Sequence, residues 1–317
     1  MRDITLKQLR SLSATVGTGT IVAAAQALHV TPPAVAQQLR LLERATGLPL
    51  FERTDRGMRA TAVGQELIEA TARIEAEISR CARLVDSIKS GSAGRVVFGA
   101  VSTAKYFAPQ LLASFKHAHP GIDVQLIIGN RQQIIEQLER HDVDLVIMGR
   151  PPVELELETE IFGSHPHVVI AAPDHPLAGQ ARVSLARLGK EAMLVRERGS
   201  GTRLLVEELF DRRRVRFPDG MEVTSNETIK QAVIAGLGVA LISAHTVAAE
   251  IAAGRLVVLD VEGLPVLRQW YVVHRADHRL LPAAATMWQF LVEHGGDHLP
   301  ALSVADQPGI SKRRSKP

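Results

Sequence analysis

Apolar residues recur with helical spacing in three short segments near the start of the chain. The segments 6–16 and 20–30, and a third that begins at Pro32, place apolar side chains three or four positions apart, which is typical of amphipathic helices. The basic segment 49–64 contains Asp-Arg-Gly at 55–57, and this pattern predicts a hairpin. We therefore expect three helices followed by a hairpin.

A longer helical pattern follows, from residue 61 to about residue 89. Its apolar seam consists of two series with a spacing of seven residues, Leu67, Ile74, Cys81 and Ile88, and Thr71, Ile78 and Val85. A seam of about three heptads predicts a helix that pairs with another helix. The alternative is an amphipathic helix that packs on its own domain. Ser and Gly residues at 90–94 end the pattern and predict a hinge.

Beyond the hinge, short apolar runs alternate with helical patterns in two sets. The first set has predicted strands at 95–100, 124–129 and 144–149, and helices at 106–118 and 131–141. The second set has predicted strands at 167–173, 192–197, 221–225, 239–243 and 256–261, then a strand at 267–275 and a helix at 281–295. Alternation favours parallel sheets in α/β units, and two sets indicate two lobes with a cleft between them. The polar end, 301–317, is expected to be disordered.

Positive charge is concentrated at the start of the chain. Residues 1–65 contain eight Lys and Arg against four Asp and Glu, which gives +4, whereas the whole chain carries +3. A basic end on a nearly neutral body indicates a polyanionic partner. The single cysteine excludes an internal disulfide. The start lacks a signal-peptide pattern, and the longest apolar run, 233–244, is shorter than the roughly 20 residues of a membrane span, so we expect a cytoplasmic protein.

The third segment has features of a helix that approaches nucleic acid. Pro32 and Pro33 are tolerated in a first turn, because the first amides of a helix lack intrahelical partners, and Thr31 can cap that turn. Gln37 and Arg40 lie on the outer face, where they can reach base edges or phosphates. An exposed arginine alone is more often merely solvated. The context, a preceding helix and a following basic hairpin, predicts a winged helix-turn-helix.

The region from Thr20 to Leu67, TIVAAAQALHVTPPAVAQQLRLLERATGLPLFERTDRGMRATAVGQEL, resembles the DNA-binding region of the LysR-type transcriptional regulators. The resemblance implies an α+β multidomain protein with an N-terminal winged helix-turn-helix (1–60), a dimerising linker helix (61–92) and a two-lobed α/β effector domain like the periplasmic binding proteins (93–300). Lobe I comprises 93–163 and 267–300, and lobe II comprises 164–266. The implied partners are promoter DNA with two half-sites, RNA polymerase, and further copies of the chain in a homodimer or homotetramer, without a membrane.

The candidate DNA-binding residues lie on the recognition helix and on the wing. They are Thr31, Pro32, Pro33, Ala36, Gln37, Arg40, Arg53, Arg56 and Arg59. Pro32 and Ala36 occupy positions where many members of the family carry a polar base-reading residue. Base recognition is therefore expected to depend on Thr31, Gln37 and Arg40, on apolar contacts with thymine methyl groups, and on DNA shape.

Three polar clusters follow predicted strands in the second half of the chain, at 101–106, 198–203 and 224–230. Glycine and small hydroxyl residues at helix starts expose amides and the positive end of the helix dipole. Candidate cations nearby are Lys105, Arg131, Arg150, Arg198, Arg203 and Lys230. Each loop alone is more often a simple helix cap. Together they predict a pocket for an anionic, phosphorylated small molecule.

Several motifs resemble the members of the family that regulate the Calvin-cycle carbon-fixation operon, VSTAKYFAP (101–109), IMGRPP (147–152), HPHVVIA (165–171), GSGTR (199–203) and TSNETIKQAVIAGLGVALIS (224–243). The resemblance implies activation of RuBisCO genes and an effector such as ribulose bisphosphate, phosphoenolpyruvate or NADPH. The implied pocket residues are Ser102, Thr103, Ser200, Gly201, Thr202, Asn226 and Thr228. His165 and His167 could approach the same cleft, although a histidine at a strand start is more often at the surface. A regulator of another metabolic operon is the alternative.

No catalytic or metal-binding set is recognisable. The run 235–240 lacks the third glycine of a dinucleotide fingerprint, the Gly-Ser-Gly at 199–201 is not a nucleophile elbow, and the histidines form no HExxH pair. We therefore expect no enzyme, metal or cofactor. Two alternatives remain, a solute-binding module with an accessory helical domain, and an α/β enzyme with an oligomerisation module. Metabolite-responsive, sequence-specific DNA binding without turnover would distinguish a regulator from both.

Overall fold

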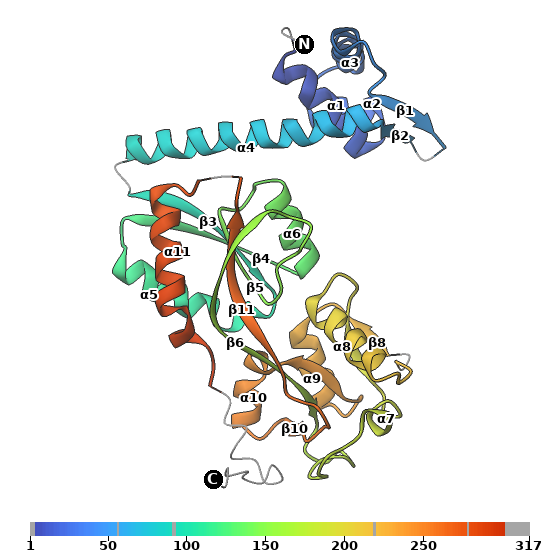
Figure 1. Ribbon diagram of the computed structural model, residues 1–317, viewed down its shortest axis with the longest axis vertical. Coiled ribbons are helices and arrows are strands. Elements are labelled where there is room, and N and C mark those ends of the chain that lie inside the picture. Colours follow the sequence, from blue (N-terminus) through green and yellow to red (C-terminus); the bar gives the residue numbers. More distant parts are fainter. Residues whose placement is uncertain (1–3, 56, 91–92, 218–219, 278, 302–317) are drawn as a thin grey trace. The chain divides into compact units, whose positions relative to one another are not determined.

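The computed structural model describes residues 4–55, 57–90, 93–217, 220–277 and 279–301, in two compact units that divide after Val85. The N-terminal unit contains α1 (Leu6–Thr18), α2 (Ile21–Ala27), α3 (Pro32–Thr46), the antiparallel hairpin of β1 (Phe51–Thr54) and β2 (Gly57–Ala60), and most of α4 (Ala62–Ser90) (Figure 1). The predicted order of three helices, a hairpin and a long helix is confirmed. The predicted disordered end lies outside the described residues, except for Ala301.

The start of α3 differs from the prediction in one respect. Thr31 occupies the N-cap position, but its side chain makes no capping hydrogen bond. A capping side chain normally accepts from the amide of the second or third helical residue. Pro33 has no amide hydrogen, and the amide of Ala34 already donates to the backbone carbonyl of Thr31 at 3.0 Å. The two prolines and the carbonyl therefore close the helix start without the threonine hydroxyl.

The predicted core face of α3 is confirmed. Val35, Leu39 and Leu42 are buried and pack with apolar residues of α1 and α2. The start of α4 also packs closely, because a Cβ on Gly64 would lie 1.9 Å from the carbonyl oxygen of Leu50. Further along α4, the seam residues Ile74, Ile78, Cys81 and Val85 are exposed in this single chain. The first part of the predicted seam thus contributes to its own unit, and the second part remains open.

The C-terminal unit is built on a mixed seven-stranded sheet. In lobe I, β3 (Gly94–Val101) pairs in parallel with β4 (Ile122–Gly129) and β5 (Leu145–Met148), with α5 (Ala108–Ala118), α6 (Arg131–Glu139) and α11 (Pro282–His294) beside them. In lobe II, β9 (Ala240–Ser243) and β10 (Val257–Leu259) pair antiparallel with β6 (Leu157–Ala171). Lobe II also holds the pair β7 (Leu194–Arg196) and β8 (Met221–Val223), and the helices α7 (Leu185–Leu188), α8 (Gly201–Arg212), α9 (Asn226–Ile234) and α10 (Ala248–Ala252).

The expectation of parallel sheets is confirmed for β3 with β4 and β5 and for β7 with β8, and it is wrong for the pairs made by β6 and β11 (Val266–Arg275). Strand β11 pairs antiparallel with β6 along its whole length, and both strands run through both lobes (Figure 1). The first part of β6 was not predicted because residues 157–161 are mostly polar and exposed, so they give no buried-strand pattern. The predicted lobe borders near 163–165 and 266 therefore fall inside hydrogen-bonded strands.

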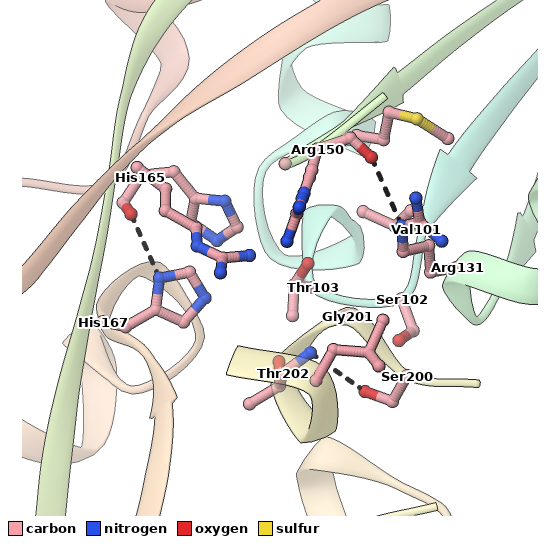
Figure 2. A pocket seen from close by; sticks show the side chains of 14 residues that line it. Val101, Ser102, Thr103, Arg131, Arg150, His165, His167, Ser200, Gly201 and Thr202 are labelled. Carbon is pink, nitrogen blue, oxygen red and sulfur yellow. Dashed lines mark hydrogen bonds between the residues drawn. The ribbon is translucent and has the colours of Figure 1, made fainter. Parts of the chain in front are cut away.

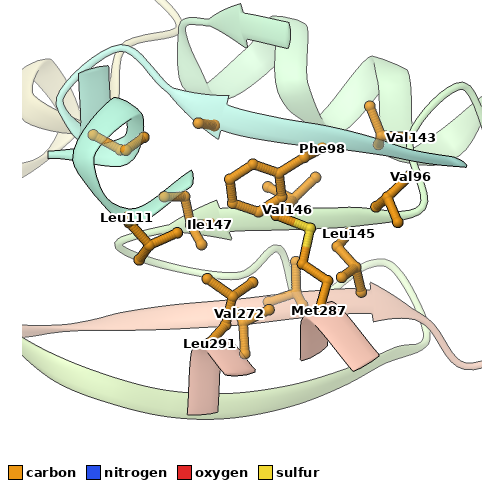
Figure 3. Close-up of a cluster of buried hydrophobic side chains, with 14 of the residues drawn as sticks. Val96, Phe98, Leu111, Val143, Leu145, Val146, Ile147, Val272, Met287 and Leu291 are labelled. Atoms are coloured by element: carbon orange, nitrogen blue, oxygen red, sulfur yellow. The ribbon is translucent and has the colours of Figure 1, made fainter. Parts of the chain in front are cut away.

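The core of lobe I holds the carboxyl ends of two parallel strands in place. Phe98 of β3 and Ile147 of β5 pack with Val272 of β11 and with Met287 and Leu291 of α11 (Figure 3). Beyond these ends the chain continues into residues 102–103 and 149–150. No helix in the described part of the chain has both the length and the apolar character needed to cross a membrane.

Candidate functional site

A cavity lies between the two lobes of the C-terminal unit (Figure 2). It contains about 540 Å³ of space free of protein atoms, including its open mouth. Its walls come from the ends of β3 and β5, the starts of α6 and α8, and the two long strands. The residues that line it are Val101, Ser102, Thr103, Arg131, Met148, Gly149, Arg150, His165, His167, Ser200, Gly201, Thr202, Leu204 and Arg268.

The start of α8 forms one wall of the cavity. Ser200 occupies the N-cap position, and its hydroxyl accepts a hydrogen bond from the amide of Thr202 at 3.3 Å. The start of α6 lies beside it, since the amide of Gln132 donates to the carbonyl of Gly199 at 3.2 Å. A Cβ on Gly199 would lie 2.7 Å from Oε1 of Gln132, and this residue has a φ of +86°. Two helix starts therefore converge here, which favours an anion.

Three arginines supply positive charge at this cavity. Arg131 lies near Gly201, and burial and the charge of Arg150 lower its pKa. Arg150 and Arg268 both pair with Glu208, at 2.5 and 2.9 Å. Three guanidinium groups against one carboxylate leave a net charge of about +2 at neutral pH. The pocket therefore matches an anionic ligand in both hydrogen-bond donors and charge.

The opposite wall contains Arg268 and two histidines, and both histidines are uncharged at neutral pH. His165 and His167 are buried, and Figure 2 shows them across the cavity from Arg131, with Arg150 and Thr103 between. Burial lowers the pKa of His167 to about 3, and burial, with smaller contributions from neighbouring charges, holds the pKa of His165 well below its usual range. The Nδ1–H of His167 donates to the carbonyl of His165 at 3.1 Å. The ring of His165 stacks on Trp270, with 3.7 Å between the ring centroids, so the two histidines are fixed in the wall and add no positive charge to that of Arg268.

Part of the predicted pocket set lines this cavity. Ser102, Thr103, Ser200, Gly201 and Thr202 do so, as do Arg131 and Arg150. The predicted residues that lie outside it are Lys105, Arg198, Arg203, Asn226 and Thr228.

Three of the residues outside the cavity contact other groups, and the other two are exposed. The side-chain oxygen of Asn226 accepts a hydrogen bond from buried Arg196, and Arg203 pairs with Glu207. Arg198 and Thr228 are exposed to solvent. The ammonium of Lys105 lies over the ring of Tyr106, 5.1 Å from its centroid.

The candidate cation Lys230 also lies outside the cavity. It is buried, and it pairs with Glu227 at 2.9 Å and with Glu250 at 2.7 Å. Its charge is therefore compensated within lobe II.

The sequence reasoning missed Arg268 and undervalued the two histidines. His165 and His167 are buried in the cavity wall rather than at the surface. Arg268 lies opposite His165 in the register of β6 and β11. This pairing joins residues about 100 positions apart, so no local pattern reveals it. The motif HPHVVIA, with two histidines on alternate positions before a buried strand, was the one available signal.

The candidate nucleic-acid interface lies on the N-terminal unit. Thr31, Pro32, Pro33, Gln37 and Arg40 are exposed along the start of α3, and Ala36 is half-buried. Arg53 and Arg59 are exposed on the hairpin, where Arg59 lies opposite Glu52 and Arg53 lies opposite Met58. Arg56 lies outside the described residues. The amide of Met58 donates to the carbonyl of Gly19 at 2.9 Å and connects the hairpin to the helices.

Comparisons with known proteins cover both units. The family described as LysR substrate binding domain matches residues 89–296, and the bacterial regulatory helix-turn-helix family, lysR family, matches residues 6–65. The HTH-type transcriptional regulator CbbR of Xanthobacter flavus is 51% identical over 300 residues, which cover 94% of this chain and 90% of that protein. The RuBisCO operon transcriptional regulator of Allochromatium vinosum is 43% identical over 289 residues, which cover 91% and 96%.

A solved structure adds a bound ligand to this comparison. The regulatory domain of CcmR from Synechocystis PCC6803, in complex with 2-PG, is 40% identical to this chain. It covers 63% of this chain and 96% of its own, with a TM-score of 0.61.

Proposed function

Because the chain belongs to the LysR family of DNA-binding transcriptional regulators, we propose that it activates carbon-fixation genes in response to a small anionic metabolite. The observation that carries the proposal is the cavity with three arginines at two converging helix starts. Relatives named for CbbR and for the RuBisCO operon support the choice of genes. The CcmR complex with 2-PG supports a small phosphorylated ligand, of the class of ribulose bisphosphate, phosphoenolpyruvate or NADPH.

We propose that two chains pair through the open half of the α4 seam. Ile74, Ile78 and Val85 are 42–47% exposed in the single chain, and covering them would remove apolar surface from water. The resulting dimers assemble into a tetramer that binds two half-sites of promoter DNA. In each bound copy α3 enters the major groove, where Gln37 and Arg40 contact base edges and phosphates.

Ligand binding would act through the arrangement of the two lobes. An anion that contacts both helix starts and both long strands binds more tightly when the lobes are close together. A ligand shifts an equilibrium only by this difference in affinity between the two arrangements. The shift changes how the dimers hold the DNA and how the complex contacts RNA polymerase.

The test is a footprint on the DNA upstream of the RuBisCO genes of the source organism, with and without ribulose bisphosphate, phosphoenolpyruvate and NADPH. We expect a specific footprint whose length changes with at least one of these metabolites. A footprint that none of them changes would contradict the proposed effector class. The absence of a specific footprint at moderate salt would favour the alternative, a LysR-type regulator of another metabolic operon, and the DNA beside its own gene would be tested next.

A further inference from the structure

A single carboxylate joins three elements beside the cavity. Glu208 lies on α8 of lobe II, Arg150 follows β5 of lobe I, and Arg268 lies on β11. Oε1 of Glu208 accepts from Nη1 of Arg150 at 2.5 Å, and Oε2 accepts from Nη2 of Arg268 at 2.9 Å. Both carboxylate oxygens are thus engaged, each with a different arginine of the cavity, and Oε2 also lies 3.9 Å from Nη2 of Arg212 on the same helix.

The two arginines separate Glu208 from the cavity. Arg150 and Arg268 line the cavity and also an adjoining groove, whereas Glu208 and Arg212 line only the groove. Burial raises the pKa of Glu208, but the hydrogen bond from Arg150 and the neighbouring positive charges outweigh burial and lower the pKa below its usual value. Glu208 is therefore ionised at neutral pH. Its side chain is 33% exposed, so water can receive the carboxylate if the arginines turn away.

Arg131 differs from the other two arginines in its hydrogen-bond partner. Among the described residues, no carboxylate lies within 4 Å of its guanidinium, and its Nε donates to the carbonyl of Arg150 at 3.3 Å. An anion can therefore bind at Arg131 and the start of α8 without displacing another anion. An anion at Arg150 and Arg268 meets guanidinium groups that are already paired.

We propose that Glu208 is an internal counter-ion, and that the effector carries two anionic groups, the second of which replaces Glu208 at Arg150 and Arg268. This inference rests on the proposed function and narrows its ligand class. The exchange substitutes one set of charge-assisted hydrogen bonds for another, so both arginines remain paired. A ligand with one anionic group binds at Arg131 and leaves the Glu208 bridge intact. Only a two-anion ligand takes the place of the Glu208 bridge between α8, lobe I and β11, so Glu208 selects ligands by the number of their anionic groups.

The test compares Glu208→Gln with Glu207→Gln in the full chain. Glu207 is the neighbouring residue on α8 and pairs with Arg203, which does not line the cavity. Isothermal titration uses phosphoenolpyruvate and ribulose bisphosphate as probes with two anionic groups, and glycerol 3-phosphate as a probe with one. We expect Glu208→Gln to raise the affinity for a two-anion probe about tenfold and that for glycerol 3-phosphate less than threefold. Glu207→Gln should change neither.

The outcomes separate this inference from the proposed function. An unchanged or weaker affinity of Glu208→Gln for the two-anion probes would show that Glu208 keeps its arginines in the complex, and it would overturn the inference alone. Equal gains for both kinds of probe would overturn it as well. If wild-type protein bound none of the probes, the anionic effector of the proposed function would fail together with this inference. A circular-dichroism spectrum and a urea unfolding transition like those of wild type would show that the variant is folded.

Discussion

Acidification should destabilise the C-terminal unit through three buried histidines. His165 and His245 lie beside Trp270, whose indole N–H donates to Nδ1 of His245 at 3.0 Å, and His167 packs against His165. Burial lowers the pKa of His167 to about 3 and that of His245 to about 4, and it lowers the pKa of His165 in the same direction. An unfolded histidine has a pKa of about 6.5. The unfolded chain therefore binds more protons than the folded chain below pH 6.5.

The magnitude follows from linkage between proton binding and folding. Stability rises with pH wherever the unfolded state binds more protons, so the stabilisation is complete above pH 6.5 and is lost as the pH falls towards the folded values. Between pH 7.5 and pH 5.0, each of His167 and His245 should lower the free energy of unfolding by about 2 kcal/mol. Together they remove about 4 kcal/mol, before any contribution from His165, which is a large part of a typical stability of about 5–15 kcal/mol.

Urea denaturation at several pH values can measure this loss. Both tryptophans of the chain, Trp270 and Trp288, lie in the C-terminal unit, so tryptophan fluorescence reports its unfolding at fixed protein concentration. His245→Asn keeps an acceptor for the indole and should reduce the loss by about 2 kcal/mol. His294→Asn, at a half-exposed position, is the control and should leave it unchanged. A free energy of unfolding that does not fall between pH 7.5 and pH 5.0 would refute the reasoning.

Two further predictions concern one unit each, anion binding by the C-terminal unit and operator binding by the N-terminal unit. Gly149→Ala would place a Cβ 2.6 Å from Nδ1 of His165. Because that ring is stacked and buried, overpacking of about 1–3 kcal/mol should distort the cavity wall. Isothermal titration should show an anion affinity reduced at least tenfold, and an affinity equal to that of wild type would contradict this reasoning. Arg40→Ala should weaken specific operator binding by about 1–3 kcal/mol in a gel-shift titration, with anion affinity unchanged. Operator preference that survives both Gln37→Ala and Arg40→Ala would show that other residues read the bases.

Local patterns were sufficient for the N-terminal unit. The spacing of Val35, Leu39 and Leu42 identified the buried face of α3, and the turn at 55–57 identified the hairpin, because each depends on neighbours a few positions away. The failed cap at Thr31 depends on local chemistry too. Pro33 removes one of the two amides that such a cap can use, but the sequence does not show that the other, that of Ala34, donates only to the carbonyl of Thr31.

In the C-terminal unit, pairing between residues remote in sequence limited what the sequence could predict. The hydroxyl and glycine clusters at 101–106 and 198–203 marked two walls of the cavity correctly, because helix starts have a local signature. Arg268 reaches the cavity only through the register of β11 against β6. Asn226 has the same kind of local signature as Ser200, but Arg196 from β7 occupies its side chain. Which residue at a helix start faces the cavity is decided by partners that are remote in sequence.

The continuous pairing of β6 and β11 also has a consequence for biosynthesis. Tyr271 of β11 pairs with Met148 of β5, and α11 completes the core of lobe I, so the first lobe to emerge from the ribosome is the last to be finished. Until residues near 290 have left the exit tunnel, one edge of β5 lacks its neighbouring strand and the apolar face beneath α11 is uncovered. Such an intermediate exposes an unpaired strand edge and apolar surface, which favour aggregation. Lobe II is formed by one contiguous segment apart from its share of β11, so nascent chains should acquire protease resistance there before lobe I.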